Sequence, residues 1–299
     1  MNRLNYEKVF KTLVEETGNY LVNHSLRAMV LGVSGGIDST VVAAICCEVN
    51  KQTNIPLIGR SLPIKNKKDE FSVSELVGKA FCNDFAVCPM TRPYHAALLN
   101  VCIDAGSANT ANSYFLEELE EMPNRTPIAN GNLQARCRMI HLYDLAGIHG
   151  GLVMSTDNQT EYQLGFWTIH GDVGDFDPIQ DLWKTEVYQL AEWLKLFYYT
   201  DGDDADKAVA IGESIKLTPT DGLGISNSDL DQIGAKSYSD VDRVLQTLVC
   251  PASPENDRVQ DALTVEIGPE IIDKIIKRRR NSRFKREKSP IYISRERYE

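Results

Sequence analysis

This sequence contains no apolar run that approaches the ~20 residues required to span a bilayer. Its N-terminal stretch, residues 1–8, also lacks the apolar core of a signal peptide. We therefore expect neither a membrane span nor a secretory leader. We therefore expect a cytoplasmic protein without a membrane partner.

Paired cysteines are also missing. The chain has seven cysteines, an odd number, and none of them forms a Cys-x-x-Cys pair. Cys46 and Cys47 lie in an apolar stretch, where reduced cysteine acts as a small apolar residue. A zinc site or a disulfide framework is therefore not expected.

An excess of positive charge is absent as well. The formal net charge is −10, whereas general nucleic-acid binding requires a basic face. Basic residues cluster only at 274–288, and acidic residues cluster at 117–121 and 201–206. A short basic stretch is more typical of a solvated helix or a small anionic ligand than of a nucleic-acid partner.

Internal repeats and clear linkers are absent too, so we expect a single domain over residues 1–299, with an N-terminal helix and a basic C-terminal tail. Apolar patterning predicts strands that alternate with helices, which is typical of an α/β fold with a doubly wound parallel sheet flanked by helices. A Thr-, Pro- and Gly-rich stretch at 216–228 predicts a loop. The strands are expected at 29–33, 55–59, 85–88 and 152–154, and the helices at 3–27, 40–49, 68–81, 130–149, after Thr160, 182–196, 241–249 and 269–280.

The most informative segment is the short run Ser34-Gly35-Gly36-Ile37-Asp38-Ser39, between an expected strand and an expected helix. Glycines allow a close backbone approach to a phosphate, and the first N–H groups of a helix have no partner within it. Ser34, Ser39 and Thr40 add hydroxyl donors. Asp38 beside a bound anion is costly unless a cation such as Mg²⁺ lies between them.

No Gly-Lys-Ser/Thr follows these glycines, so the segment is not the common phosphate loop. It resembles the Ser-Gly-Gly-x-Asp-Ser signature of pyrophosphatase-loop enzymes, which cleave ATP between the α and β phosphates. A tight turn with Asp38 as a helix cap is the alternative interpretation.

Further blocks narrow the resemblance. Residues 131–139, 155–166, 171–179 and 181–187 resemble, in order, the motifs of the NAD synthetase family. This resemblance implies a Rossmann-like fold of the adenine nucleotide alpha hydrolase type. It also implies amidation of nicotinate adenine dinucleotide to NAD through an acyl-adenylate, with ATP as co-substrate and with release of AMP and pyrophosphate.

The resemblance also implies residue roles. Asp38 and Glu161 resemble Mg²⁺ ligands, and Asp38 and Lys184 resemble the catalytic pair. The residues that resemble dinucleotide contacts are Arg136, Asp175, Phe284 and Lys285. Those that resemble ATP contacts are Gly32, Val33, Ser34, Gly35, Gly36, Ile37, Asp38, Ser39, Thr156, Lys184 and Thr220. Read without the motifs, Glu161 is a helix N-terminal acid, Arg136 a surface charge and Asp175 a turn acid.

Four departures concern the nicotinate end of the site. The family has a lysine where this sequence has Ile169, and a His-Lys pair where it has Phe284-Lys285. The Gly-Asp block that contains Asp175 is one residue shorter than in many bacterial members. The arginine expected beside Leu62-Pro63 is shifted to Arg60.

Glutamine-using relatives carry an additional amidase domain. Because the predicted ATP loop lies near residue 34, we expect no such domain before it. We expect free ammonia as the donor, and a homodimer by resemblance. The competing hypotheses are a GMP-synthetase-like amidase, a tRNA thiolase, and a nucleotide-binding relative without turnover. The thiolase hypothesis would require paired cysteines and a basic surface.

Overall fold

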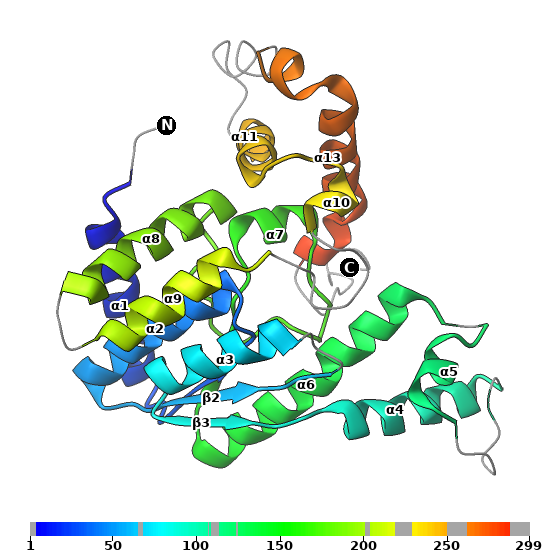
Figure 1. Cartoon of the computed structure of the whole chain (residues 1–299), viewed down its shortest axis with the longest axis horizontal. Helices are drawn as coiled ribbons and strands as arrows, with labels where there is room; N and C mark the ends of the chain where they lie inside the picture. The colour runs from blue at the N-terminus through cyan, green and yellow to red at the C-terminus, as the bar shows by residue number, and fades with distance from the viewer. Residues whose placement is uncertain are drawn as a thin grey trace, which may run out of the picture.

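The computed structural model describes residues 4–64, 68–106, 108, 114–123, 125–200, 204–218, 229–249 and 262–287. Four parallel strands form one sheet in the order β3-β2-β1-β4, which confirms the predicted α/β fold (Figure 1). Within the described part of the chain, no helix is long and apolar enough to cross a bilayer. The strands are β1 Met29–Gly32, β2 Leu57–Ser61, β3 Asp84–Val87 and β4 Leu152–Met154.

Helices cover both faces of this sheet, because the central strands are apolar on both sides. Figure 1 shows α3 over one face and α6 below the other. The helices are α1 Tyr6–Asn23, α2 Ile37–Thr53, α3 Lys68–Phe81, α4 Thr91–Asp104, α5 Leu116–Glu120, α6 Pro127–His149, α7 Gln159–Leu164, α8 Lys184–Thr200, α9 Ala205–Lys216, α10 Asp229–Ile233, α11 Tyr238–Val249 and α13 Pro269–Asn281, followed by the 3-10 turn Arg283–Arg286.

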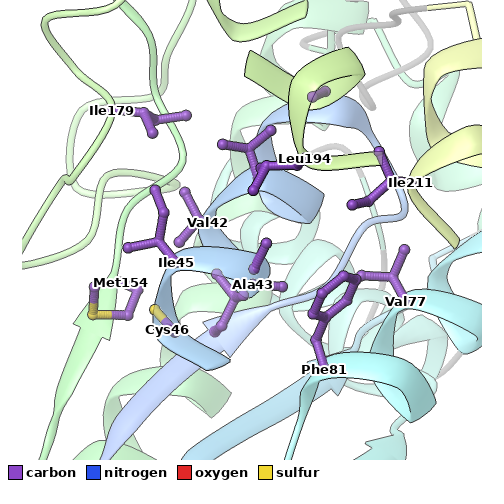
Figure 2. Packing of buried hydrophobic residues seen from close by; sticks show 14 of the residues in the cluster. Val42, Ala43, Ile45, Cys46, Val77, Phe81, Met154, Ile179, Leu194 and Ile211 are labelled. Carbon is purple, nitrogen blue, oxygen red and sulfur yellow. The ribbon is translucent and has the colours of Figure 1, made fainter. Parts of the chain in front are cut away.

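The larger core lies between the sheet and helices α1, α2, α3, α8 and α9. Helix α2 is apolar around most of its circumference, which is typical of a helix buried within the core. Val42 and Ile45 of α2 lie near Leu194 of α8, and Ala43 faces Val77 and Phe81 of α3 (Figure 2). Burial of α2 fixes the position of its N-terminus, where the predicted ATP loop ends.

A second core packs α4, α5 and α6 against the opposite face of the sheet, through residues such as Tyr94, Leu98 and Leu142. A third apolar cluster joins α7 to the C-terminal helices, with Leu164 packed among residues that include Val241, Leu245 and Ile275. The C-terminal helices are therefore tied to α7, which carries Glu161.

Several predicted boundaries were wrong, for local reasons. Strand β2 begins at Leu57 rather than at residue 55, because Pro56 has no N–H to donate to the ladder. Helix α6 begins at Pro127 rather than at residue 130, since the Thr126 hydroxyl accepts from Ala129 N and proline suits the first turn. Helices α4 and α9 were not predicted, and α4 tolerates Pro93 because it lies in the first turn.

Two helical glycines provide a test of the packing between α3 and the edge strand. A Cβ atom at Gly78 would lie 2.1 Å from the Phe85 ring, whereas at Gly212 it would meet only the Lys195 side chain, at 3.8 Å. We predict that Gly78→Ala destabilises the protein by about 1–3 kcal/mol through overpacking. Gly212→Ala, the matched control, should instead stabilise it by about 0.5–1 kcal/mol.

Thermal unfolding of both variants measures this difference. If Gly78→Ala is at least as stable as Gly212→Ala, the close packing of α3 on β3 is wrong.

Candidate active site

The topology of the sheet places two functional segments side by side. Strands β1 and β4 are adjacent and parallel, with Leu31 opposite Met154, and the chain reverses its strand order between them. Such a switch point opens a crevice at the carboxyl ends of the strands. The loop after β1 leads to Asp38 in the first turn of α2, and the loop after β4 leads to Glu161 in α7.

The glycine-rich loop is held by its own hydroxyl groups. Ser34 Oγ accepts from Gly36 N at 3.1 Å and lies 2.9 Å from Ser39 Oγ. Helix α2 begins at Ile37 with Gly36 as its N-cap, and no side chain caps it. The first-turn N–H groups are therefore available to an anion, as the sequence predicted.

Neighbouring helices fix the shape of the loop. Gly35 has a φ of +84°, and a Cβ there would lie 2.7 Å from Ser74 N of α3. Gly35 O accepts from Ser214 Oγ of α9 at 2.8 Å. Only glycine fits this left-handed position without displacing the α3 backbone.

At the centre of the site, the ammonium group of Lys184 contacts two carboxylates. Lys184 Nζ forms an ion pair with Asp38 Oδ2 and lies 3.1 Å from Glu161 Oε1. The Lys184 side chain is 2% exposed, against 17% for Asp38 and 19% for Glu161. Burial would lower the pKa of Lys184, but the Asp38 and Glu161 carboxylates raise it well above its ordinary value.

Asn158 orients the same two carboxylates. Its Nδ2 donates to Asp38 Oδ1 at 2.9 Å, and its backbone N donates to Glu161 Oε2 at 3.2 Å. Asn158 is also the N-cap of α7, since its Oδ1 accepts from Glu161 N. The Asp38 carboxylate therefore faces across the site rather than capping its own helix, against the alternative interpretation.

A cavity of about 340 Å³ opens beside these groups. Of the predicted ATP and metal residues, those that line it are Ser34, Asp38, Ser39, Thr156 and Glu161. Its other wall residues include Asn132, Phe166, Trp167 and Arg278. The guanidinium of Arg278 lies 3.6 Å from the centre of the Phe166 ring, which places a cation on an aromatic face of the wall.

A larger cavity of about 910 Å³ adjoins the first, and the two share Asp157, Trp167 and Lys285 as wall residues. Trp167 stacks on Tyr162, with ring centroids 5.5 Å apart and planes 3° from parallel. Two adjoining cavities of these sizes suit two small-molecule ligands that meet at the shared wall.

The predicted dinucleotide residues lie around the larger cavity. Arg136, Phe284 and Lys285 line it, and so does Ile169, whose carbonyl accepts from Arg136 Nη2 at 3.2 Å. The Asp175 carboxylate accepts from Val153 N and from Tyr143 Oη, and thereby holds Tyr143 at the cavity wall. Thr220 lies outside the described residues, so its role stays a prediction.

The Lys285 ammonium supports the wall between the cavities. Its Nζ donates to Gly165 O at 2.7 Å and to Trp167 O, and burial lowers its pKa. Arg60, to which the expected arginine is shifted, pairs with Asp84 at 2.8 Å. Arg138, two residues after Arg136 in the same motif, instead donates to Leu62 O at 3.0 Å.

Three aspartates form an acidic cluster near the shared wall, and their roles were not predicted. Burial raises the pKa of Asp157 well above its ordinary value, helped by the nearby Asp172 and Glu161 charges. Loss of hydration likewise raises the pKa of Asp172 to about 6 and that of Asp177 to about 7. All three lie within the motif blocks 155–166 and 171–179, and this position was the only feature of the sequence that indicated a role for them.

The oxygen ligands suit a divalent cation that arrives with its substrate. Across the described ranges, no group of three or more His, Cys, Asp or Glu side chains is arranged to hold a metal ion. Asp38 and Glu161 are two hard oxygen donors, and each pairs with Lys184 Nζ. Mg²⁺ typically binds through one or two carboxylates plus substrate phosphates, so the donor set fits that ion.

Asp177 gives a pH-dependent test of this electrostatic environment. Its Oδ1 accepts from Ile179 N, and its buried Oδ2 has no hydrogen-bond partner within the described part of the chain. Because its folded pKa lies above its unfolded value, the folded state binds the extra proton, and stability falls as the pH rises from about 4 to 7. We predict that Asp177→Asn raises the Tm at pH 8 by about 2–4 °C and has little effect at pH 4.5.

Scanning calorimetry at the two pH values checks this. An equal Tm change at both would show that the Asp177 charge carries no penalty.

The chain is similar to known proteins along nearly its whole length. Residues 9–289 match the NAD synthase family. The NH(3)-dependent NAD(+) synthetase of Methanococcoides burtonii is 31% identical over 92% of this chain and 90% of its own length, and that of Wolinella succinogenes is 30% identical over 97% of both. Among solved structures, NMN synthetase from Francisella tularensis has a TM-score of 0.72 at 21% identity, covering 98% of this chain and 100% of its own. The NH3-dependent NAD synthetase from Campylobacter jejuni has a TM-score of 0.64 at 22% identity, covering 97% and 100%. These two structures support the fold, and the sequence match establishes that the chain belongs to the NAD synthase family.

Proposed function

We propose that this protein catalyses the ammonia- and ATP-dependent amidation of nicotinate adenine dinucleotide to NAD, with release of AMP and pyrophosphate. The observation that carries the proposal is the buried Lys184 between Asp38 and Glu161, beside a glycine-rich loop and a second cavity. Relatives named as NH(3)-dependent NAD(+) synthetases, 30–31% identical over most of both chains, support it.

The first step joins the two ligands at the shared wall. A carboxylate oxygen of the nicotinate attacks the α-phosphorus of ATP, the bond from that phosphorus to the bridging oxygen breaks, and pyrophosphate leaves. This reaction requires aligned reactants and neutralised charge rather than a protein nucleophile. The loop N–H groups and Lys184 are suited to both tasks.

Mg²⁺ bound by Asp38 and Glu161 together with the ATP phosphates would neutralise charge as pyrophosphate departs. Asn158 holds both carboxylates in orientation, and Lys184 balances their charge. Thr156 in the cavity wall and Thr220 complete the proposed ATP contacts.

In the second step, ammonia attacks the acyl carbon, the bond to the adenylate oxygen breaks so that AMP leaves, and the nitrogen loses one proton to solvent as the amide forms. Ammonium must first lose a proton, and a carboxylate with a raised pKa is a suitable acceptor near neutral pH. We propose Asp172, which has a pKa of about 6 and lines the smaller cavity, for this role.

The larger cavity is proposed to hold the dinucleotide. The flat Tyr162–Trp167 pair offers an aromatic surface, and Arg136 and Lys285 offer positive charge for its phosphates. Phe284 lines the same cavity and adds a second apolar surface. Asp175 acts here through Tyr143, which it holds at the wall.

A product assay tests the function. With nicotinate adenine dinucleotide, Mg-ATP and ammonium, the wild-type protein should form NAD, AMP and pyrophosphate in equal amounts. Asp38→Ala should lower kcat by about 10²–10³-fold, because it removes one of the two proposed Mg²⁺ ligands and one of the two carboxylates that hold the Lys184 ammonium. Asp104→Ala, at an exposed acid of α4, is the matched control and should retain full activity.

Nicotinate mononucleotide is assayed in parallel, since a similar structure is named as an NMN synthetase. Formation of ADP, a preference for the mononucleotide, or undiminished turnover by Asp38→Ala would each contradict the proposal.

We further propose that the protein works as a homodimer of single-domain chains. Helix α6 exposes Ile140 and Ile148, which are 70% and 68% exposed and lie eight residues apart on one helical face. Ile140 and the neighbouring Tyr143 also line the larger cavity. A second copy packed on α6 by two-fold symmetry would bury this apolar face and cover the cavity wall.

Sedimentation tests the dimer. The wild-type protein should have twice the 33.5 kDa mass of one chain, and the double variant Ile140→Glu/Ile148→Glu should be monomeric. Leu196→Glu on α8, a control at a residue 63% exposed, should remain dimeric. A monomeric wild type would overturn the dimer, and a double variant that stays dimeric would overturn α6 as its interface.

A further inference from the structure

A buried carboxylate outside the predicted site connects its two principal helices. Asp242 of α11 is 1% exposed. One of its oxygens accepts a hydrogen bond from Thr160 Oγ1, and the other accepts from Thr185 N at 2.9 Å. Thr160 belongs to α7 and Thr185 to α8, so one side chain joins the starts of both helices.

The Thr160 hydroxyl extends this connection. While it donates to Asp242, Thr160 Oγ1 also accepts from Lys184 N at 2.9 Å. The backbone N–H groups of Lys184 and Thr185 are therefore both bound, one through the hydroxyl and one directly. A carboxylate at the N-terminus of α8 is also favourable to the helix dipole.

These hydrogen bonds are one residue away from the charged groups of the site. Glu161 follows Thr160, and Lys184 precedes Thr185. The 3.1 Å contact between Lys184 Nζ and Glu161 Oε1 depends on the relative position of the two helix starts. Asp242 and Thr160 therefore join the two helix starts through side chains, beside the backbone hydrogen bond from Gln159 N to Leu182 O at 2.9 Å.

The position of Asp242 is itself fixed by packing. Val241, Val244 and Leu245 of α11 are buried in the apolar cluster that includes Leu164 of α7. The Tyr238 ring of α11 lies 5.6 Å from Lys184 Nζ, so the same helix also contacts the charged centre.

We propose that Asp242 is a positioning residue, which aligns Lys184 and Glu161 for the phosphates of ATP through the Thr160 hydroxyl. This inference rests on the proposed function for its meaning, since the aligned groups are those assigned to adenylate formation. It identifies α11, a C-terminal helix, as part of the support of the ATP site.

The test uses four single variants of the full chain and the double variant Asp242→Asn/Thr160→Val, each assayed where calorimetry shows it to be folded. Asp242→Asn removes the charge at constant shape, and Asp240→Asn is the matched control on the same helix. Thr160→Val removes the hydroxyl, whereas Thr160→Ser keeps it.

We expect Asp242→Asn and Thr160→Val each to lower kcat/KM for ATP by about 10–100-fold, because a small misplacement of reacting groups has effects of that size. The KM for ammonium should stay within about two-fold, and the double variant should lose little more than either single variant, since both act through one chain of hydrogen bonds. Thr160→Ser should restore most of the activity that Thr160→Val loses.

If Asp242→Asn does not fold, the Thr160→Val and Thr160→Ser pair decides the question alone. An active Asp242→Asn with kcat/KM for ATP within two-fold of the Asp240→Asn value would overturn the inference and leave the proposed function standing. If the wild type forms no amide, the proposed function fails. The positioning role of Asp242 is then tested separately, by calorimetric titration of the variants with ATP. Asp242→Asn should then bind ATP at least five-fold more weakly than Asp240→Asn, and equal affinity would overturn the inference.

Discussion

A buried ammonium group held between two carboxylates organises this protein. Removal of Lys184 from water is expensive, and the Asp38 and Glu161 charges offset that cost, so the three groups are stable as a set. They come from three helices whose starts meet at one edge of the sheet. The arrangement concentrates opposite charges where the phosphates would separate. It requires the surrounding elements to keep the three helix N-termini in fixed positions relative to one another.

The fold meets this requirement through burial. Helix α2 is enclosed by the larger core, so the loop that precedes it cannot shift without disturbing apolar contacts. Helix α7 is short, and the third apolar cluster and the Asn158 cap hold it in place. The cavity proposed for the dinucleotide is less constrained, because it is walled in part by exposed residues of α6 such as Ile140.

The sequence predicted the parts of this account that are local. The loop, Asp38 and Glu161 lie in short motifs at strand ends, and the structure brings them together with Lys184. Asp242 was not predictable in this way, because its partner Thr160 lies 82 residues away and a lone Asp on a helix has no distinctive pattern. Tyr143 was missed for a similar reason, since its role comes from a hydrogen bond to Asp175 across the fold. The edge of β2 was misplaced because Pro56 interrupts an apolar run that otherwise reads as strand.

The proposed amidation depends above all on an acyl-adenylate, in which a nicotinate carboxylate oxygen becomes bonded to the α-phosphorus of ATP. Oxygen isotope transfer tests this most directly. With both carboxylate oxygens of the substrate labelled with ¹⁸O, one labelled oxygen per turnover should be recovered in AMP and the other in the amide of NAD. Recovery of the label in pyrophosphate or water, with unlabelled AMP, would contradict the account.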